Sequence, residues 1–234
     1  MKSTIVVAAL VVTALTSFTA TAGEADVRAA AEARLGKVDK ITRAPISGLW
    51  EVVAKGELYY MDDKGNYLIS GDLFDIKSRK NLSNERRKDI WSSAINSSLD
   101  SAIKQVRGNG KRVLVTFEDP NCGYCKKLAK DIAKIKDVTV YTFLLASLGE
   151  DSRTKARGVW CSADRVKTWN DWMLNGTQIP PAAATCDASG FDRSVELGQA
   201  LRIDGVPALF FVGGERVGGY IPAAEIEKRL AATP

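Results

Sequence analysis

The stretch TFEDPNCGYCKKLAKDI, residues 116–132, decides the fold, because it places two cysteines one helical turn apart after an apolar run. The run RVLVTF at 112–117 is typical of a buried strand, and the apolar residues that follow recur at helical spacing over 122–135. Cys122 and Cys125 therefore lie where a strand turns into a helix. Such a pair can be a redox centre, half of a zinc site or a buried structural pair. Other features of the chain are needed to distinguish these three possibilities.

The segments downstream predict a sheet with helices on it. Strands alternate with helical patterns and end in a hairpin, so the order favours an α/β sheet of mixed strand directions. The expected elements are a strand at 138–146, helices at 152–175 and 191–201, a hairpin at 207–220 turned by Gly213-Gly214, and a closing helix at 222–231.

The first half of the chain has a different composition and predicts a separate small domain at 23–82. An alanine-rich helix at 24–35 precedes short aromatic-rich strands, and MDDKGNY at 61–67 has the turn chemistry of a hairpin. A domain of this size has little interior to bury. We therefore expect it to associate with a second copy of itself.

Residues 83–109 predict a helical linker between the two domains. Ser83 is a candidate N-cap, and Gly108 ends the helical pattern. The apolar residues fall on one face, so we expect the helix to rest on a neighbour. They are Trp91, Ile95, Leu99, Ala102, Ile103 and Val106.

The N-terminal segment, residues 1–22, reads as a secretory signal peptide. Lys2 supplies a positive start, 5–15 is apolar, and Ala-Thr-Ala at 20–22 has the small-x-small cleavage pattern. A membrane anchor is a poor alternative, because about 20 apolar residues are needed to span a bilayer. We expect export to an oxidising compartment, the periplasm, where an even number of cysteines favours disulfides or dithiol pairs.

Composition excludes several other classes of protein. The chain has no histidine, which removes Ser-His-Asp triads, Cys-His proteases and histidine-ligated metals. No second C-x-x-C follows Cys125, so the spacing disagrees with paired zinc knuckles and we expect no metal. The net charge of +5 comes without a basic stripe of interleaved aromatics, so nucleic acid is not an expected partner.

The helix start gives the two cysteines different expected roles. Free backbone N–H groups and the helix dipole stabilise a thiolate at Cys122. The turn at Pro120 and Asn121 should expose Cys122 and leave Cys125 one turn inward. We therefore predict that Cys122 is the attacking nucleophile and Cys125 the resolving thiol, with no organic cofactor.

With these motifs in place, the chain resembles the periplasmic thiol:disulfide interchange proteins of the DsbC/DsbG type, and is closer to DsbC. The resemblance covers nearly the whole mature chain. It rests on FEDPNCGYCKKL, VWCSADR, TCDAS, LGQALRIDGVPALFF and GGYIP, and in the first half on PISGLWEV and GELYYMDDKGNYLISGDLFDI. It implies a cystatin-like dimerisation domain at 23–82, a helical linker at 83–109 and a thioredoxin-like catalytic domain with a helical insertion at 110–234.

The resemblance also implies residue roles around the dithiol. Pro207 matches the cis-proline, and Val206 before it presents its backbone to substrate. Gly123 and Tyr124, between the cysteines, are candidate substrate contacts, although Tyr124 also fits an exposed spacer.

Two further roles are implied outside the dithiol. Cys161 and Cys186 match a structural disulfide, with a second redox pair as the alternative. Gly71 matches the dimer-forming strand, with an ordinary turn glycine as the alternative.

Three positions depart from the pattern of the family. Val206 replaces the usual threonine, as in DsbA oxidases, and Lys126 replaces a histidine common after the second cysteine. Thr116 occupies the position of thioredoxin's buried aspartate, so no carboxylate base is expected there, and Glu118 is expected to be solvated.

Together these observations predict a homodimeric periplasmic disulfide isomerase and reductase. Its substrates would be misfolded disulfide-containing exported proteins, and a DsbD-like membrane reductase would restore its dithiol. The alternatives are a DsbG-like reductase that protects single cysteines from sulfenylation, a DsbA-like oxidase, and a non-catalytic periplasmic chaperone.

Overall fold

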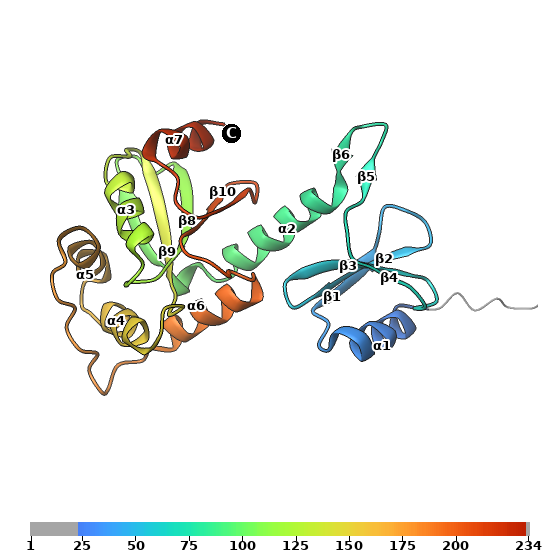
Figure 1. The fold of residues 1–234 in the computed structure, drawn as a ribbon, viewed down its shortest axis with the longest axis horizontal. Helices are drawn as coiled ribbons and strands as arrows, with labels where there is room; N and C mark the ends of the chain where they lie inside the picture. Colours follow the sequence, from blue (N-terminus) through green and yellow to red (C-terminus); the bar gives the residue numbers. More distant parts are fainter. Residues whose placement is uncertain (1–22, 233–234) are drawn as a thin grey trace, which may run out of the picture.

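The computed structural model describes residues 23–232, which form two lobes joined by a long helix (Figure 1). The predicted signal peptide at 1–22 lies outside the described residues. Across the described chain, no helix is both long and apolar enough to cross a bilayer.

The N-terminal lobe is a four-stranded antiparallel sheet with one helix packed on it. The helix is α1 (Glu24–Leu35), and the strand order is β1-β2-β3-β4. Apolar side chains from α1 and from one face of the sheet form a single core. The expected hairpin at 61–67 is confirmed, because β3 pairs with β4 across it. The strands are β1 (Lys40–Arg43), β2 (Leu49–Ala54), β3 (Glu57–Asp62) and β4 (Leu68–Ile69).

A short hairpin of β5 (Phe74–Asp75) and β6 (Lys80–Asn81) leads into α2 (Leu82–Asn96). The prediction of Ser83 as N-cap is wrong. The side chain of Asn81 caps the helix by accepting the Asn84 N–H at 2.8 Å. Ser83 is buried instead, and its hydroxyl bonds the Tyr60 hydroxyl and the Leu73 N–H, each at 2.7 Å.

The predicted helical linker at 83–109 is also wrong beyond Asn96. The hydroxyls of Ser97 and Ser98 bond the Ala94 carbonyl at 2.9 Å, a local bond that competes with helix continuation. A 3₁₀ turn, η1 (Leu99–Ser101), and strand β7 (Ile103–Arg107) follow.

The residues around Ile103 and Val106 fit the period of a helix as well as that of a strand. Ile103 and Val106 are three residues apart, as on one face of a helix, whereas burial alternates from residue to residue along β7, as in a strand. Antiparallel pairing with β9 (Val138–Leu144) decides for a strand. The sheet of the second lobe therefore begins before residue 110, where the catalytic domain was expected to start.

The second lobe has three layers around a five-stranded sheet of order β11-β10-β8-β9-β7 (Figure 1). Strand β8 (Arg112–Glu118) runs parallel to β9 and antiparallel to β10 (Ala208–Phe211), which turns at Gly213-Gly214 into β11 (Arg216–Gly218). Helices α3 (Gly123–Ile132) and α7 (Ala223–Ala231) bury one face, and α6 (Ser189–Ala200) with the end of α2 buries the other. The expected mixed α/β sheet is confirmed.

The helical insertion between β9 and α6 differs from the single helix expected at 152–175. It consists of α4 (Glu150–Trp160), α5 (Arg165–Asn170) and a π-helical turn, η2 (Asp171–Asn175). Asp164 interrupts the helix because its carboxylate caps α5 by accepting the Lys167 N–H at 2.9 Å. The insertion shares a core with Cys122 and Cys125, so it packs directly against the candidate site.

The two lobes touch at a second place besides α2. The β2–β3 turn at Gly56 lies against the end of α6, so close that a Cβ on Gly56 would approach the Ala200 carbonyl oxygen to 1.6 Å. Beside this contact, Glu57 pairs with Arg202 at 3.5 Å. Glycine is required at position 56, since its φ is also +74°.

Candidate active site

Cys122 is the N-cap of α3, as the strand-turn-helix pattern predicts. Its Sγ accepts the backbone N–H of Cys125 at 3.1 Å, and both cysteines are free thiols. The first turn of a helix presents unpaired N–H groups and the positive end of the dipole. The sulfur of Cys122 therefore lies where the backbone stabilises a negative charge.

The expected exposure of Cys122 is only partly met. Cys122 is 6% exposed, whereas Cys125 is 0% exposed. The order is as expected, but Cys122 is packed in the core that it shares with the insertion, and the loop before β10 lies against it. Its Sγ lies 3.5 Å from the Val206 carbonyl oxygen, to which the thiol donates.

The other residues predicted to contact substrate surround this sulfur. The Val206–Pro207 peptide bond is cis, and its loop lies against Cys122. Tyr124 is 66% exposed, and a Cβ added at Gly123 would meet no atom within 4 Å. The structure thus brings Val206 to the dithiol and leaves the surface over Gly123 and Tyr124 open.

Glu118 is buried, so the expectation that it is solvated is wrong. It is 1% exposed, its Oε1 accepts the Thr116 hydroxyl at 2.7 Å, and its Oε2 has no partner. Residues 114, 116 and 118 of a strand share one face, and α3 covers that face here. The position of Glu118 next to the turn suggests a solvated side chain, and its burial follows only from the packing of α3 over β8.

Burial changes the acid–base properties of Glu118 and Cys125. Desolvation raises the pKa of Glu118 to about 7, against a smaller lowering by the Thr116 hydroxyl. Burial also raises the pKa of the Cys125 thiol, and the negative charge of Glu118 raises it further. Cys125 therefore keeps its proton until a nearby base takes it.

Helix α4 holds the turn that precedes Cys122. Asp119 accepts the Ser152 hydroxyl at 2.7 Å and the Leu148 N–H at 3.1 Å. The Asn121 amide donates to Asp151 at 2.7 Å and to Ser152 at 3.0 Å. Residues of α4 and the loop before it thus fix the orientation of the turn that carries Cys122, although they belong to neither β8 nor α3.

Trp172 is a site residue that the sequence pattern did not identify. Its spacing with Trp160, Trp169 and Met173 predicts core packing, and those three are buried. Trp172 is only half-buried, and its indole N–H donates to the Pro120 carbonyl at 2.6 Å. Helical spacing in the sequence does not distinguish Trp172 from the three buried residues, because the π-helical turn η2 changes which residue faces the site.

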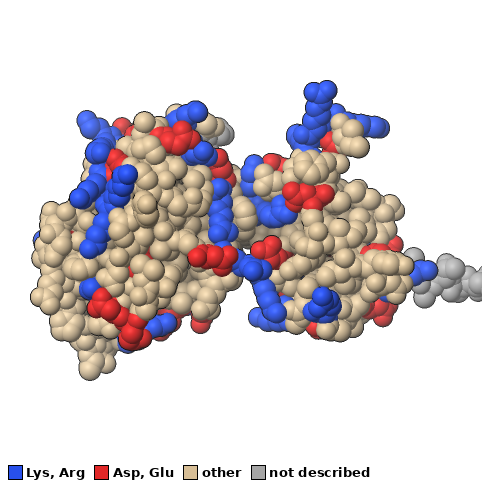
Figure 2. Space-filling view, in the orientation of Figure 1, with Lys and Arg blue, Asp and Glu red and all other residues tan. Residues whose placement is uncertain are grey.

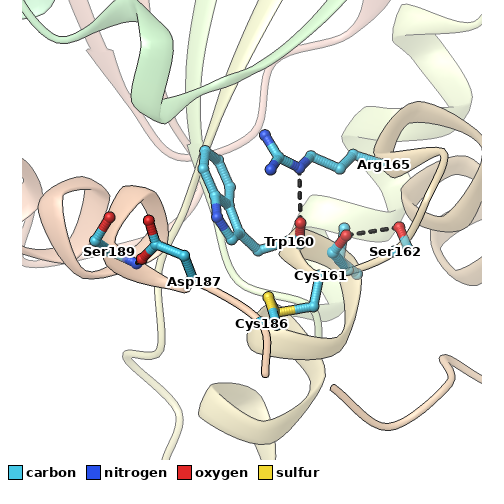
Figure 3. The surroundings of a disulfide bond; sticks show 8 residues. Trp160, Cys161, Ser162, Arg165, Cys186, Asp187 and Ser189 are labelled. Carbon is cyan, nitrogen blue, oxygen red and sulfur yellow. Dashed lines mark hydrogen bonds between the residues drawn. A yellow bond between two sulfur atoms is a disulfide. The ribbon is translucent and has the colours of Figure 1, made fainter. Parts of the chain in front are cut away.

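Cys161 and Cys186 form a disulfide between the end of α4 and the loop before α6 (Figure 3). Beside it, Arg165 donates to the Trp160 carbonyl at 2.6 Å, and its guanidinium lies 3.8 Å from the centre of the Trp160 ring. The bridge thus fastens the last turn of α4 within the insertion.

Gly71 lies two residues beyond the edge strand β4 and outside any strand. A Cβ at Gly71 would meet no atom within 4 Å. Nothing in the single chain therefore requires glycine there. Large apolar side chains nearby are exposed: Tyr67, Ile69, Phe74 and Ile76.

The residues between 23 and 232 contain no group of three cysteine, aspartate or glutamate side chains placed to hold a metal ion.

Comparison with known proteins matches both lobes. The family of the disulfide bond isomerase protein N-terminal domain matches residues 18–84, and the thioredoxin-like domain family matches residues 99–234. The probable thiol:disulfide interchange protein DsbC of Bordetella pertussis is 44% identical over 194 residues, 82% of this chain and 68% of its own. DsbC of Escherichia coli K12 is 28% identical over 205 residues, 85% of this chain and 84% of its own.

Among solved structures, a disulfide interchange protein from Neisseria gonorrhoeae is 39% identical, with a TM-score of 0.53. The alignment covers 58% of this chain and 96% of that one. The two family matches follow one another along the chain in the same order as the two lobes. The chain belongs to the DsbC family of thiol:disulfide interchange proteins and is a thiol–disulfide oxidoreductase with a thioredoxin-like fold.

Proposed function

We propose that this protein is a disulfide isomerase and reductase that repairs wrongly paired exported proteins, with Cys122 as nucleophile and Cys125 as resolving thiol. One observation carries the proposal: Cys122 caps α3, so that its sulfur receives the Cys125 N–H and keeps the only exposed surface of the pair. A thiolate is the species that attacks a disulfide.

In the first step the Cys122 thiolate attacks one sulfur of a mispaired substrate disulfide. A mixed disulfide forms, the substrate bond breaks, and the displaced sulfur leaves as a thiolate with the electron pair. A second substrate thiolate then attacks the mixed disulfide and returns Cys122 as a thiolate. This sequence rearranges the substrate without net oxidation.

In the competing step Cys125 attacks the mixed disulfide. A Cys122–Cys125 disulfide forms, and the substrate leaves reduced by two electrons. An external dithiol, in our proposal a DsbD-like membrane reductase, must then reduce the enzyme. Burial of Cys125 supports slow resolution, since its proton has to be removed first.

We further propose a homodimer formed through the N-terminal lobe. Strand β4 lies at an open edge of the sheet. Exposed apolar side chains lie before Gly71 (Tyr67, Ile69) and after it (Phe74, Ile76). Exposed edges and apolar patches of this kind favour pairing with another chain. Two catalytic lobes would then share one cleft for unfolded chains.

The periplasm is the proposed location. The apolar segment at 5–15 with its cleavage pattern supports export, and the disulfide between Cys161 and Cys186 fits an oxidising compartment.

Reactivation of scrambled ribonuclease tests the proposed function. Wild type should restore activity, Cys122→Ala should not, and Cys125→Ala should retain part of it, since isomerisation needs only Cys122. Activity retained after both cysteines are replaced would favour a non-catalytic chaperone. Failure to reactivate, together with fast oxidation of a reduced substrate, would favour a DsbA-like oxidase, the candidate that Val206 supports.

Trapping identifies the substrates. Cys125→Ala should accumulate mixed disulfides through Cys122, which a reductant releases. The matched Cys122→Ala variant should accumulate none. Equal labelling of both variants would reject the assigned roles.

A further inference from the structure

Two lysine side chains lie on one aromatic ring beside the dithiol. Lys126 Nζ lies 4.1 Å and Lys155 Nζ 4.6 Å from the centre of the Trp172 ring. The indole N–H of Trp172 bonds the Pro120 carbonyl at 2.6 Å, so the ring is fixed to the turn that precedes Cys122. Cation–π attraction restrains both ammonium groups, whereas the ammonium group of a lysine at the surface is otherwise mobile.

Both lysines are anchored to the segment that carries Cys122. Lys126 follows Cys122 by four residues, its N–H bonds the Cys122 carbonyl at 3.1 Å, and side chains at this spacing are neighbours on a helix. Lys155 reaches the turn from α4 and donates to the Asn121 side-chain oxygen at 2.8 Å.

The positive charge is only partly neutralised. Lys155 pairs with Asp151, while Lys126 forms no ion pair with any residue between 23 and 232. Asp119 accepts bonds from Ser152 and Leu148 and does not reach either lysine. Figure 2 shows lysine and arginine side chains gathered over the part of the catalytic lobe where Figure 1 places α3.

We infer that Lys126 and Lys155, held on Trp172, select substrates whose disulfide is flanked by negatively charged groups. The substrate class is a polypeptide with acidic residues next to the mispaired cysteine. The inference rests on the proposed exchange at Cys122 and adds a preference to it. In the exchange step the substrate S–S bond breaks and the Cys122–substrate S–S bond forms. The leaving sulfur departs as a thiolate, whose charge the same lysines attract.

Three small disulfides of different charge test this selectivity. Oxidised glutathione is anionic, cystamine is cationic, and 2-hydroxyethyl disulfide is neutral. The readout is the ratio of the second-order rate constants for oxidised glutathione and cystamine, measured in the Cys125→Ala background so that only the first step is seen. Because both probes react with the same sulfur, a general change in thiolate reactivity cancels in this ratio.

For the unsubstituted lysines the ratio should exceed one and should fall as salt is raised from about 0.01 M to about 1 M, where the Debye length shrinks to about 3 Å. Lys126→Gln with Lys155→Gln should lower the low-salt ratio by about tenfold. Trp172→Leu should lower it part of the way, because the ammonium groups lose their support.

Lys130→Gln is the matched control, since it removes one exposed charge from the same helix two turns away from Cys122. It should keep the ratio. An unchanged ratio in the double variant, or an equal fall in Lys130→Gln, would overturn the inference. If the neutral disulfide is not attacked at all, the proposed function itself fails. If it is attacked while the ratio stays near one, only the charge selectivity fails.

Discussion

The Thr116 hydroxyl donates to Glu118 across 2.7 Å, inside the lobe at the end of β8. This bond satisfies one carboxylate oxygen and leaves the other without a partner. A buried charge with one unpaired oxygen is costly, so the carboxyl favours its protonated form. We therefore expect the stability of the protein to depend on pH close to neutrality.

The wild-type protein should lose stability as the pH rises from 4.5 to about 7, and Glu118→Gln should abolish this dependence on pH. The pKa of Glu118 is raised to about 7, so in that window the folded protein binds a proton that the unfolded chain has released. Stability therefore falls as pH rises, by about 3 kcal/mol in all. Urea unfolding at several pH values measures the slope, in a Cys122→Ser, Cys125→Ser background that removes both thiols.

Glu150→Gln is the control for this slope. Glu150 is exposed at the start of α4, so its replacement should keep the wild-type dependence on pH. A slope that persists in Glu118→Gln would mean that another group titrates.

Glu118→Gln should also slow the attack of Cys125 on a mixed disulfide, by about 10²-fold if the carboxylate accepts the Cys125 proton. The negative charge of Glu118 raises the pKa of the Cys125 thiol, so the carboxylate acts electrostatically on that thiol. Stopped-flow release of glutathione from the Cys122 mixed disulfide measures the step. Alkylation of Cys122 by iodoacetamide should change little, and a large change there would argue for general disruption of the site.

Gly190→Ala should destabilise the catalytic lobe by about 1–3 kcal/mol, the usual cost of overpacking. An added Cβ would lie 1.9 Å from Cζ2 of the buried Trp160 ring. Gly218→Ala is the control, because its Cβ would meet no atom within 4 Å. Thermal or urea unfolding of both variants checks the prediction, and equal stability would place the Trp160 ring elsewhere.

Replacing Cys161 and Cys186 together by alanine should cost roughly 3 kcal/mol, because their bridge closes a loop of 25 residues in the unfolded chain. Urea unfolding of the double variant against wild type measures the loss. If the double variant is as stable as wild type, the disulfide does not reduce the conformational entropy of the unfolded chain as expected.

Gly71→Arg should give monomers, since a long cation just beyond the open edge strand β4 does not fit against a second chain. The single chain leaves open space at this position, so the substitution should not disturb the fold of the protomer. Light scattering measures the mass. Gly218→Arg adds the same charge at an exposed, open position of the catalytic lobe and should remain dimeric. A dimer mass in both variants would reject the placement of the interface.

The sequence predicts those parts of the fold that local pattern determines. The strand at 112–117, the helix after Cys122 and the turn at Gly213-Gly214 follow from short-range apolar spacing and turn chemistry. The strand at Ile103–Arg107 does not, because pairing with β9 makes it a strand where the local spacing also fits a helix.

The site follows the same division. Cys122 and Cys125 are visible from their spacing at a helix start. Glu118 and Trp172 are not, because burial of the first depends on α3 packing over β8, and the second reaches Pro120 from 52 residues away.

The bridge between Cys161 and Cys186 gives the protein an order of maturation. It fastens the end of α4, and α4 holds the turn from which Cys122 projects. In a newly made chain whose Cys161 and Cys186 are still thiols, the end of α4 lacks this bridge, and the turn that carries Cys122 is held less firmly. An oxidant from elsewhere must therefore close this bond before the dithiol of the same chain has its final support.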